Sequence, residues 1–349
     1  MEQAFDLLKL LIETPSFSKE EAILADQLVA FFNSKSIPCQ RKFNNIWAFN
    51  KCFDSTKKTI LLNSHIDTVK PCSGYTTNPF EYFENEEIIR GLGSNDAGGC
   101  VVSLICTFLH FYDANDLKYN ICLLLSAEEE ISGKNGVEEA LKNIPQPILG
   151  IVGEPTSLEL AVAEKGLLVV DCQVKGFSGH AAREEGENAF YKALNDFNWI
   201  KNYKFDRVSE LLGETKMTCT IVNCGTAHNV TPDVCIYTLD IRTNELYTHE
   251  EIIQILKNNL TADIQPRSTR LQSSGLPKNH PIFQISEKMG LKNYGSPTLS
   301  DQALMNFPTI KFGPGDSKRS HTPDEFIYKQ QIAEGIEKYK QLLELIMNY

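Results

Sequence analysis

Four short motifs in the sequence carry side chains that could bind metal ions. They are His65-Ile-Asp67, Asn95-Asp96-Ala-Gly-Gly, Glu128-Glu129-Glu130 and Gly153-Glu154-Pro-Thr. Imidazole nitrogens and carboxylate oxygens are the usual ligands of catalytic zinc, and a zinc-bound water is a good nucleophile near neutral pH. The motifs therefore indicate the chemistry of a metal-activated water.

His65 and Asp67 are spaced as a metal ligand and its supporting group would be. Residues two apart in an extended chain project on the same side, so the Asp67 carboxylate can face the His65 ring. A zinc-bound imidazole usually donates its other N–H to such a carboxylate. Because an H-x-D pair alone is more often an ordinary hydrogen-bonded histidine, this interpretation needs the other motifs.

The run of three glutamates follows an apolar segment. Consecutive carboxylates after a buried strand are costly unless they are paired or bound to metal. Adjacent side chains point in different directions, so one carboxylate could bind a metal while its neighbour holds the attacking water. A solvated loop is the alternative interpretation of the same run.

These motifs lie where the strands of an α/β fold are expected to end. Residues 58–64 and 119–126 are apolar runs of strand length, a helical pattern over residues 99–112 lies between them, and residues 149–152 precede Glu154. Strand, helix and strand in alternation predict an α/β sheet covered on both faces. Such folds bind ligands at the carboxyl ends of their strands.

From residue 166 the pattern changes to that of a small α+β domain. We expect a strand over 167–174, a helix over 188–203, strands over 218–223 and 233–242, and a helix over 248–260. Helices over 4–13, 19–35 and 328–347 and a strand over 307–312 belong to the first domain. The prediction is a catalytic domain of residues 1–164 and 272–349 with residues 165–271 inserted.

Composition excludes several classes of protein. A formal net charge of -11 without a basic cluster argues against nucleic-acid binding. The first residues lack the pattern of a signal peptide, and no apolar run is long enough to cross a membrane, so we expect a cytoplasmic protein. The ten cysteines contain no C-x-x-C pair, and six of them lie in apolar runs, which predicts buried free thiols.

The order of the motifs resembles a known family. H-x-D, N-D-A-G-G, E-E and G-E-P-T-S, followed late in the chain by G-P-G and S-H-T-P-D-E, are similar to the co-catalytic zinc amidohydrolases. That family includes acetylornithine deacetylase, succinyl-diaminopimelate desuccinylase, aminoacylase and carboxypeptidase G. The resemblance spans nearly the whole chain and implies a zinc-peptidase-like catalytic domain with a mixed sheet covered by helices, plus an inserted α+β lid and dimerisation domain.

The resemblance also implies two Zn²⁺ ions, with Co²⁺ as an alternative metal. The implied ligands are His65 and Glu154 for one ion, Glu130 and His321 for the other, and Asp96 between the two. Glu129 becomes the general base and Asp67 the supporting residue. Because the run has three glutamates, Glu128-Glu129 could instead be the pair of base and ligand.

The inserted domain and the late glycines supply the implied substrate site. His180 and Asn229 match residues that reach into the partner chain's site in the family, and Arg242 matches one that grips the substrate carboxylate. Gly313 and Gly315 of the G-P-G motif are also assigned to substrate binding. The expected assembly is a homodimer formed through the inserted domain.

Within the family, the late motifs look most like the acetylornithine deacetylase branch. The predicted substrate is N-acetyl-L-ornithine, or N-acetyl- or N-succinyl-citrulline, in arginine biosynthesis. Leu299 stands where the desuccinylase has a polar Thr, which makes that enzyme a weaker alternative. A dipeptidase or carboxypeptidase would use the same metal chemistry, whereas a non-catalytic metal-binding protein would not need Glu129.

Overall fold

The computed structural model describes residues 1–183 and 185–349. Within them the chain forms two compact units. The first comprises Met1–Val162, Gly275–Tyr294 and Ser300–Tyr349, and the second comprises Ala163–Ser274 and Gly295–Leu299. The catalytic and lid roles assigned to the two parts of the chain stay predictions.

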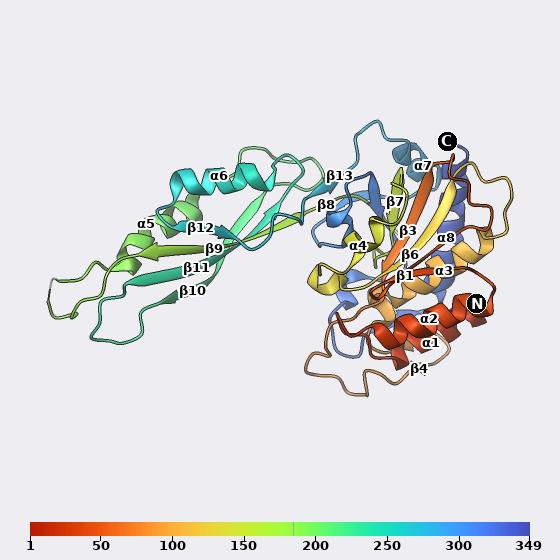
Figure 1. Ribbon diagram of the computed structural model, residues 1–349, viewed down its shortest axis with the longest axis horizontal. Coiled ribbons are helices and arrows are strands. Elements are labelled where there is room, and N and C mark those ends of the chain that lie inside the picture. The colour runs from red at the N-terminus through yellow and green to blue at the C-terminus, as the bar shows by residue number, and fades with distance from the viewer. Residues whose placement is uncertain (184) are drawn as a thin grey trace. The chain divides into compact units, whose positions relative to one another are not determined.

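The first unit is built on a mixed sheet (Figure 1). Its strands, in spatial order, are β1 (Gln40–Lys42), β2 (Asn45–Phe49), β6 (Asn120–Ser126), β3 (Thr59–His65), β7 (Leu149–Val152), β15 (Thr309–Lys311), β8 (Leu160–Glu164) and β13 (Ser274–Gly275), with β14 (Asn293–Ser296) paired to β8. β3 is parallel to both β6 and β7, and β15 is parallel to β7. β2 runs antiparallel to β6.

Both faces of this sheet are apolar because its central strands β3 and β6 are buried along their whole length and carry continuous apolar runs, Ile60–Leu62 and Ile121–Leu125. Ile60 and Leu62 of β3 face one core, whereas Leu61 between them faces the other. Ile121 and Cys122 of β6 divide in the same way. This alternation within a continuous apolar run is typical of strands buried on both sides.

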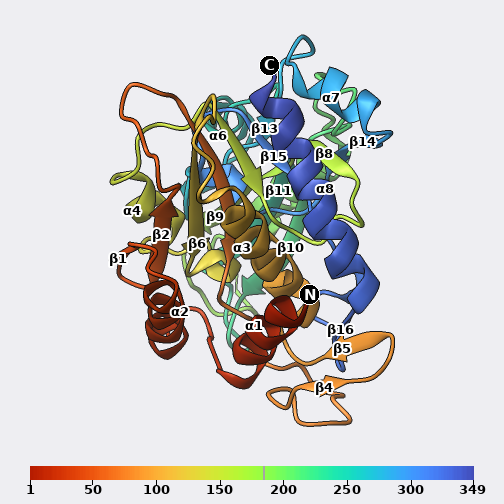
Figure 2. The ribbon, with the colours of Figure 1, turned by 90° about the vertical axis from the view of Figure 1, so that its right-hand side faces the viewer.

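Helices cover the two faces unequally. The helices of this unit are α1 (Glu2–Glu13), α2 (Ala22–Ser34), α3 (Gly99–Phe111), α4 (Val137–Leu141), α7 (Ile282–Lys288) and α8 (Lys329–Met347). Figure 2 looks onto the face that carries α3 and α8 side by side. α1, α2 and α7 share their core, while α4 packs into the core of the other face. A smaller sheet orders β16 (Phe326–Tyr328), β5 (Ile88–Arg90) and β4 (Phe83–Glu84).

The second unit is a four-stranded antiparallel sheet with two helices. Its order is β10 (Lys216–Cys224), β11 (Val234–Thr243), β9 (Gly166–Lys175) and β12 (Asp263–Pro266), and its helices are α5 (Ala189–Asn202) and α6 (His249–Asn259). Alternate residues of β9, such as Val170 and Cys172, are buried in one core with both helices. Because both helices pack on the same side, the opposite side of the sheet is left more open.

The predicted α/β architecture is confirmed, with differences at element boundaries. Helix α2 begins at Ala22 rather than at residue 19, because Lys19 has φ 77°, a left-handed conformation that a helix does not accept. β15 covers only Thr309–Lys311 of the strand expected over 307–312, since Pro308 lacks an N–H to donate. Strands β2 and β8 are among the elements that were not predicted, as are helices α4 and α7.

Two expectations from composition can be compared with the structure. All ten cysteines belong to the described residues and are free, as predicted, although Cys106 and Cys219 are only half-buried. Among the described residues, every helix is too short or too polar to cross a lipid bilayer.

Candidate metal centre

The predicted ligands gather at one edge of the larger sheet. His65 ends β3, the three glutamates follow β6, and Glu154 lies two residues after β7. The register pairs His65 with Ser126 and Asn63 with Val152, so the three parallel strands end at nearly the same level. Parallel strands therefore bring together residues that are far apart in the sequence.

Asp96 lies between two histidines. Its Oδ1 is 3.3 Å from His65 Nε2, and its Oδ2 is 3.7 Å from His321 Nε2. Glu154 Oε1 lies 3.9 Å from His65 Nε2, and Glu130 Oε2 lies 3.0 Å from His321 Nε2. Each histidine thus has a carboxylate of its own and shares Asp96, which is the arrangement expected of two neighbouring ions with one common ligand.

Glu129 is the remaining carboxylate of this cluster. Its Oε2 is 3.9 Å from His65 Nε2, and its side chain is 12% exposed. Burial raises the pKa of Glu129 well above its usual range, and the neighbouring Glu154 and Glu130 add to the rise. A carboxyl group with a raised pKa is suited to accept a proton and return it.

The donor set fits divalent cations. Burial, together with the charge of the nearby Asp96, raises the pKa of Glu154 to about 8. Carboxylates crowded in this way become stable in their charged forms when a cation lies among them. His65 with Asp96 and Glu130, and His65 with Glu129 and Glu154, each offer ligand atoms within 4.8 Å of one another. Imidazole and carboxylate donors in this number suit Zn²⁺.

Asp67 supports this cluster in two ways. Its backbone carbonyl oxygen is 2.9 Å from His65 Nδ1, whereas its carboxylate is 3.6 Å away. The carboxylate instead accepts the backbone N–H groups of Glu129 and Glu130 and the hydroxyl of Ser18. Asp67 thus orients the imidazole mainly through its main chain, and its side chain holds the turn that carries the two glutamates.

Glu128 points away from the cluster. Its carboxylate accepts a hydrogen bond from Asn135 Nδ2 at 3.1 Å, and its backbone N–H donates to Glu21 Oε1 at 3.1 Å. The residue is 6% exposed and has φ 56°, so the chain turns sharply there. Of the two possible pairs, Glu129-Glu130 is the one whose carboxylates face the histidines.

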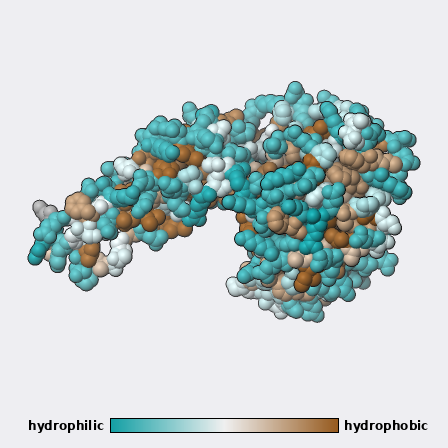
Figure 3. Space-filling view, viewed as in Figure 1, coloured by the Kyte–Doolittle hydropathy of each residue, from teal (hydrophilic) through white to brown (hydrophobic). Residues whose placement is uncertain are grey.

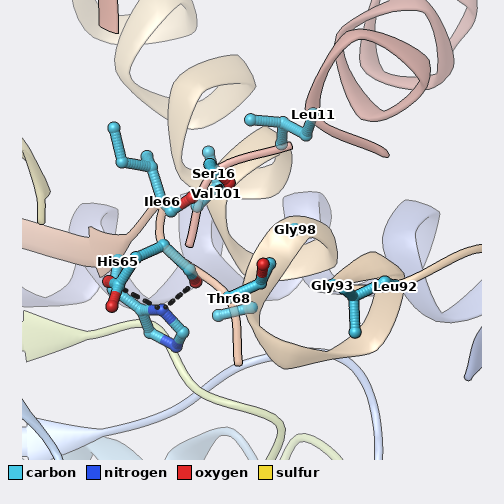
Figure 4. A pocket seen from close by; sticks show the side chains of 11 residues that line it. Leu11, Ser16, His65, Ile66, Thr68, Leu92, Gly93, Gly98 and Val101 are labelled. Carbon is cyan, nitrogen blue, oxygen red and sulfur yellow. Dashed lines mark hydrogen bonds and ion pairs between the residues drawn. The ribbon is translucent and has the colours of Figure 1, made fainter. Parts of the chain in front are cut away.

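The cavity that His65 lines together with Ile66, Thr68 and Gly93 has no room for a substrate. Figure 4 shows His65 beside Ile66, Thr68 and Gly93 around a cavity of about 10 Å³. A cavity of that size holds one water molecule at most. At the other end of the cluster the His321 side chain is 53% exposed, so the cluster is open to solvent there.

The two glycines assigned to substrate binding have a clear packing role. A Cβ on Gly313 would lie 2.6 Å from Cys100 Sγ and 2.7 Å from the carbonyl oxygen of Glu154. Gly315 has φ 95°, and a Cβ there would lie 2.7 Å from Asn95 Oδ1. Both glycines thus let the chain pass close behind segments that carry metal ligands, and their contact with substrate stays a prediction.

The other assigned substrate residues belong to the second unit, where the structure brings together only two of the three. His180 pairs with Val230 in a β-bridge, and Ala181 N–H donates to the carbonyl of Asn229 at 3.0 Å. Arg242 lies near the other end of β11, where Nε and Nη2 bond the Asp240 carboxylate at 2.9 and 3.1 Å.

A buried network that was not predicted lies beneath the cluster. Ser126 donates to Asp301 Oδ2 at 2.5 Å and accepts from Asn63 Nδ2 at 2.9 Å. Burial raises the pKa of Asp301 to about 7, and the Asp301 charge contributes to the raised pKa of Glu129. In the sequence, Asp301 is a single acidic residue between Ser300 and Gln302, and it belongs to no motif of distinctive spacing.

The fold and the cluster are those of a metal-dependent hydrolase, and the cluster is its candidate metal site. Residues 61–345 match the model of Peptidase family M20/M25/M40, and the chain belongs to that family. Its members include amidohydrolases and peptidases that act on acylated amino acids or small peptides.

Relatives with known names agree with this assignment. The chain is 30% identical over 308 residues to acetylornithine deacetylase of Proteus mirabilis (strain HI4320), which covers 82% of this chain and 79% of the relative. Its fold resembles aminopeptidase PepT of Bacillus cereus ATCC 10987, with TM-score 0.78, 18% identity and coverage of 99% and 98%. The YXEP protein of Bacillus subtilis, a dinuclear metal-binding M20 peptidase, matches with TM-score 0.77, 14% identity and the same coverage.

Proposed function

We propose that this protein hydrolyses the amide bond of an N-acyl-L-amino acid with two Zn²⁺ ions. The observation that carries the proposal is the position of Asp96 between His65 and His321, with Glu129 beside them. The leading substrate is N-acetyl-L-ornithine, with N-acetyl- and N-succinyl-citrulline as close alternatives. Acetylornithine deacetylases among the relatives support this substrate class.

In the proposed reaction, different residues of the chain bind the ions and transfer the proton. His65, Glu154, Glu130, His321 and Asp96 would hold the ions, which would acidify a shared water and polarise the scissile carbonyl. Glu129 would accept the proton of that water and deliver it to the leaving nitrogen. The turn held by Asp67 keeps Glu129 and Glu130 in their different positions, and the contacts of Glu128 with Asn135 favour this assignment over the shifted pair.

Arg242 is the proposed partner of the substrate α-carboxylate. A guanidinium matches a carboxylate through two parallel hydrogen bonds. In this chain Nε and Nη2 already bond Asp240, and the Arg242 side chain is 39% exposed. A substrate carboxylate would therefore share the guanidinium with Asp240 or take the place of the Asp240 carboxylate.

A homodimer through the second unit is the proposed assembly. β10 is an edge strand of nine residues, and Ile221 and Val222 on it are 47% and 49% exposed. Apolar surface is visible over this unit among polar surface in Figure 3. Exposed edge strands of this kind are templates for pairing with another chain. A cytoplasmic location and a place in arginine biosynthesis stay predictions.

Hydrolysis of a defined substrate panel tests the proposal. The zinc-loaded protein should release acetate from N-acetyl-L-ornithine or N-acetylcitrulline, or succinate from N-succinyl-citrulline, faster than it cleaves dipeptides. Faster cleavage of dipeptides or of C-terminal peptide bonds would assign the protein to the peptidases of the family. N-succinyl-diaminopimelate belongs in the panel because the desuccinylase is the remaining alternative.

A further inference from the structure

The side chain of Glu325 makes three hydrogen bonds to the turn that carries Asp96. The residue is 2% exposed. Its Oε1 accepts the backbone N–H groups of Asn95 and Asp96, both at 2.8 Å, and its Oε2 accepts that of Gly93 at 3.0 Å. One carboxylate thus holds three N–H groups of the turn that carries the shared ligand.

The main chain of Glu325 adds to this attachment. Its carbonyl oxygen accepts the N–H of Gly91 at 3.0 Å and the hydroxyl of Ser94 at 3.2 Å. Five hydrogen bonds therefore join Glu325 to residues 91–96. Asp96 itself has φ -121° and ψ 96°, outside the helical region, so the regular bonding of a helix does not fix its backbone. The Asp96 N–H donates to the Glu325 carboxylate.

Glu325 also belongs to the segment that carries a ligand. It lies four residues after His321, whose Nε2 is 3.0 Å from Glu130 Oε2. Residues 321–325 thus contain a predicted ligand of one ion at one end and the anchor of the shared ligand at the other. A displacement of this segment would move both.

We propose that Glu325 is a positioning residue that fixes the Asp96 carboxylate relative to His321 and thereby determines the affinity for both ions. This inference depends on the proposed function, in which Asp96 is the shared ligand. Replacing Glu325 by Gln keeps the shape of the side chain but sets an NH₂ group against at least one backbone N–H. Two donors then face each other, and the turn must move.

Asp196 provides a matched control for the loss of a buried carboxylate. It is 1% exposed and accepts hydrogen bonds from Tyr237 OH at 2.9 Å and from the backbone N–H and hydroxyl of Thr261 at 2.8 and 3.0 Å. It belongs to the second unit, whereas all predicted metal ligands belong to the first. Asp196→Asn should therefore destabilise the fold without changing the metal centre.

The experiment is a metal titration of the full chain after removal of metal with a chelator. Zn²⁺ binding is measured by calorimetry, Co²⁺ binding by its visible absorption, and unfolding of each metal-free protein by urea. Glu325→Gln should bind both ions about 10- to 100-fold more weakly, as is usual when a group supporting a ligand is lost, and should change the Co²⁺ spectrum. Asp196→Asn should keep wild-type affinity and spectrum.

Glu325→Asp is the conservative variant, because it keeps the charge and shortens the side chain by one methylene. It should bind metal more tightly than Glu325→Gln even where the two have equal urea stability, and it takes the same test if Glu325→Gln does not fold. Wild-type affinity and spectrum in the folded Glu325 variants would overturn the inference alone. Failure of the wild-type protein to bind two ions would instead overturn the proposed function.

Discussion

The metal centre and the predicted lid residues differ in how their side chains are held. At the centre, Asp67 and Glu325 are almost fully buried, and their carboxylates accept backbone N–H groups of the turns that carry the ligands. In the second unit, His180 is exposed, and its ring accepts the N–H of Ala182, two residues along. The turns that carry the predicted metal ligands are thus held by buried carboxylates, whereas the ring of His180 is held by a local hydrogen bond.

This difference separates the assignments that depend on contacts within one chain from those that need a substrate or a second chain. Asp96, His65 and His321 meet without any partner, so their roles depend only on the geometry within one unit. His180 and Arg242 lie in another unit, and their roles depend on a substrate and a second chain.

Replacing Glu129 should have the largest effect. Glu129→Gln removes the proposed base but no proposed ligand, so turnover should fall by about 10⁴-fold, the upper end for a general base, while metal content stays near that of the wild type. Glu130→Gln should lose both metal and activity. Glu128→Gln is the matched control, and a dead but metal-replete Glu128 variant would shift the assignment by one residue.

Replacing His180 tests whether the second unit completes a site in trans. His180→Ala should lower turnover by about 10²- to 10³-fold, as expected for one donor to a tetrahedral oxyanion. Mixing it with Glu129→Gln after dissociation makes half the dimers mixed, and each mixed dimer has one intact site, so roughly a quarter of wild-type activity should return. With exchange verified, no recovery would mean that His180 acts within its own chain or not at all.

Replacing Arg242 should affect substrate binding more than chemistry. Arg242→Ala should raise KM by about 10- to 100-fold, the usual range for a charged hydrogen bond of about 1.5–3 kcal/mol. Analogues without the α-carboxylate should lose much less. Equal losses on both kinds of substrate would show that Arg242 has a structural role, through its bond to Asp240, and does not bind the substrate carboxylate.

Metal binding should depend on pH. The hydrogen bond to Glu130 raises the pKa of His321 to about 9, and burial raises the pKa of Glu154 to about 8. Both groups therefore carry protons near pH 7 in the metal-free protein and must lose them to bind an ion. Calorimetry in buffers of different ionisation enthalpy should detect proton release near pH 7, and the apparent affinity should increase as the pH rises toward about 9. Binding without proton release near pH 7 would contradict this.

The same shift has a consequence for stability. Because the pKa of His321 is raised above its usual 6.5, its pair with Glu130 stabilises the metal-free fold fully below about pH 6.5, and this contribution is lost as the pH rises through about 9. The His321 side chain is 53% exposed, so solvent weakens the contribution.

The sheet and the motifs at its strand ends could be predicted from regular patterns, whereas His321 was assigned only through the resemblance to a known family. Continuous apolar runs predict buried strands, and polar residues directly after them, such as His65 and Glu130, predict a site at the strand ends. Glu325 and Asp301 could not be assigned in this way. Glu325 acts through backbone N–H groups more than two hundred residues away in the chain, and no spacing rule reports such a contact.

The role of Asp67 could also be predicted only in part from its spacing. Its spacing from His65 predicted a carboxylate that orients the ring, but the closer contact comes from its carbonyl oxygen. Its carboxylate holds the backbone of Glu129 and Glu130, a contact across 62 and 63 residues. Alternation along a strand gives the side on which a side chain lies, but not the partner it meets there.

The central claim is that Asp96 is shared by two ions, and metal analysis tests it most directly. Wild-type protein loaded with Zn²⁺ and freed of excess metal should contain two ions per chain, and Asp96→Ala should lose most of both, because the shared carboxylate serves each ion. A wild-type protein that binds one ion at most after careful loading, or an Asp96→Ala variant that keeps both, would contradict the account.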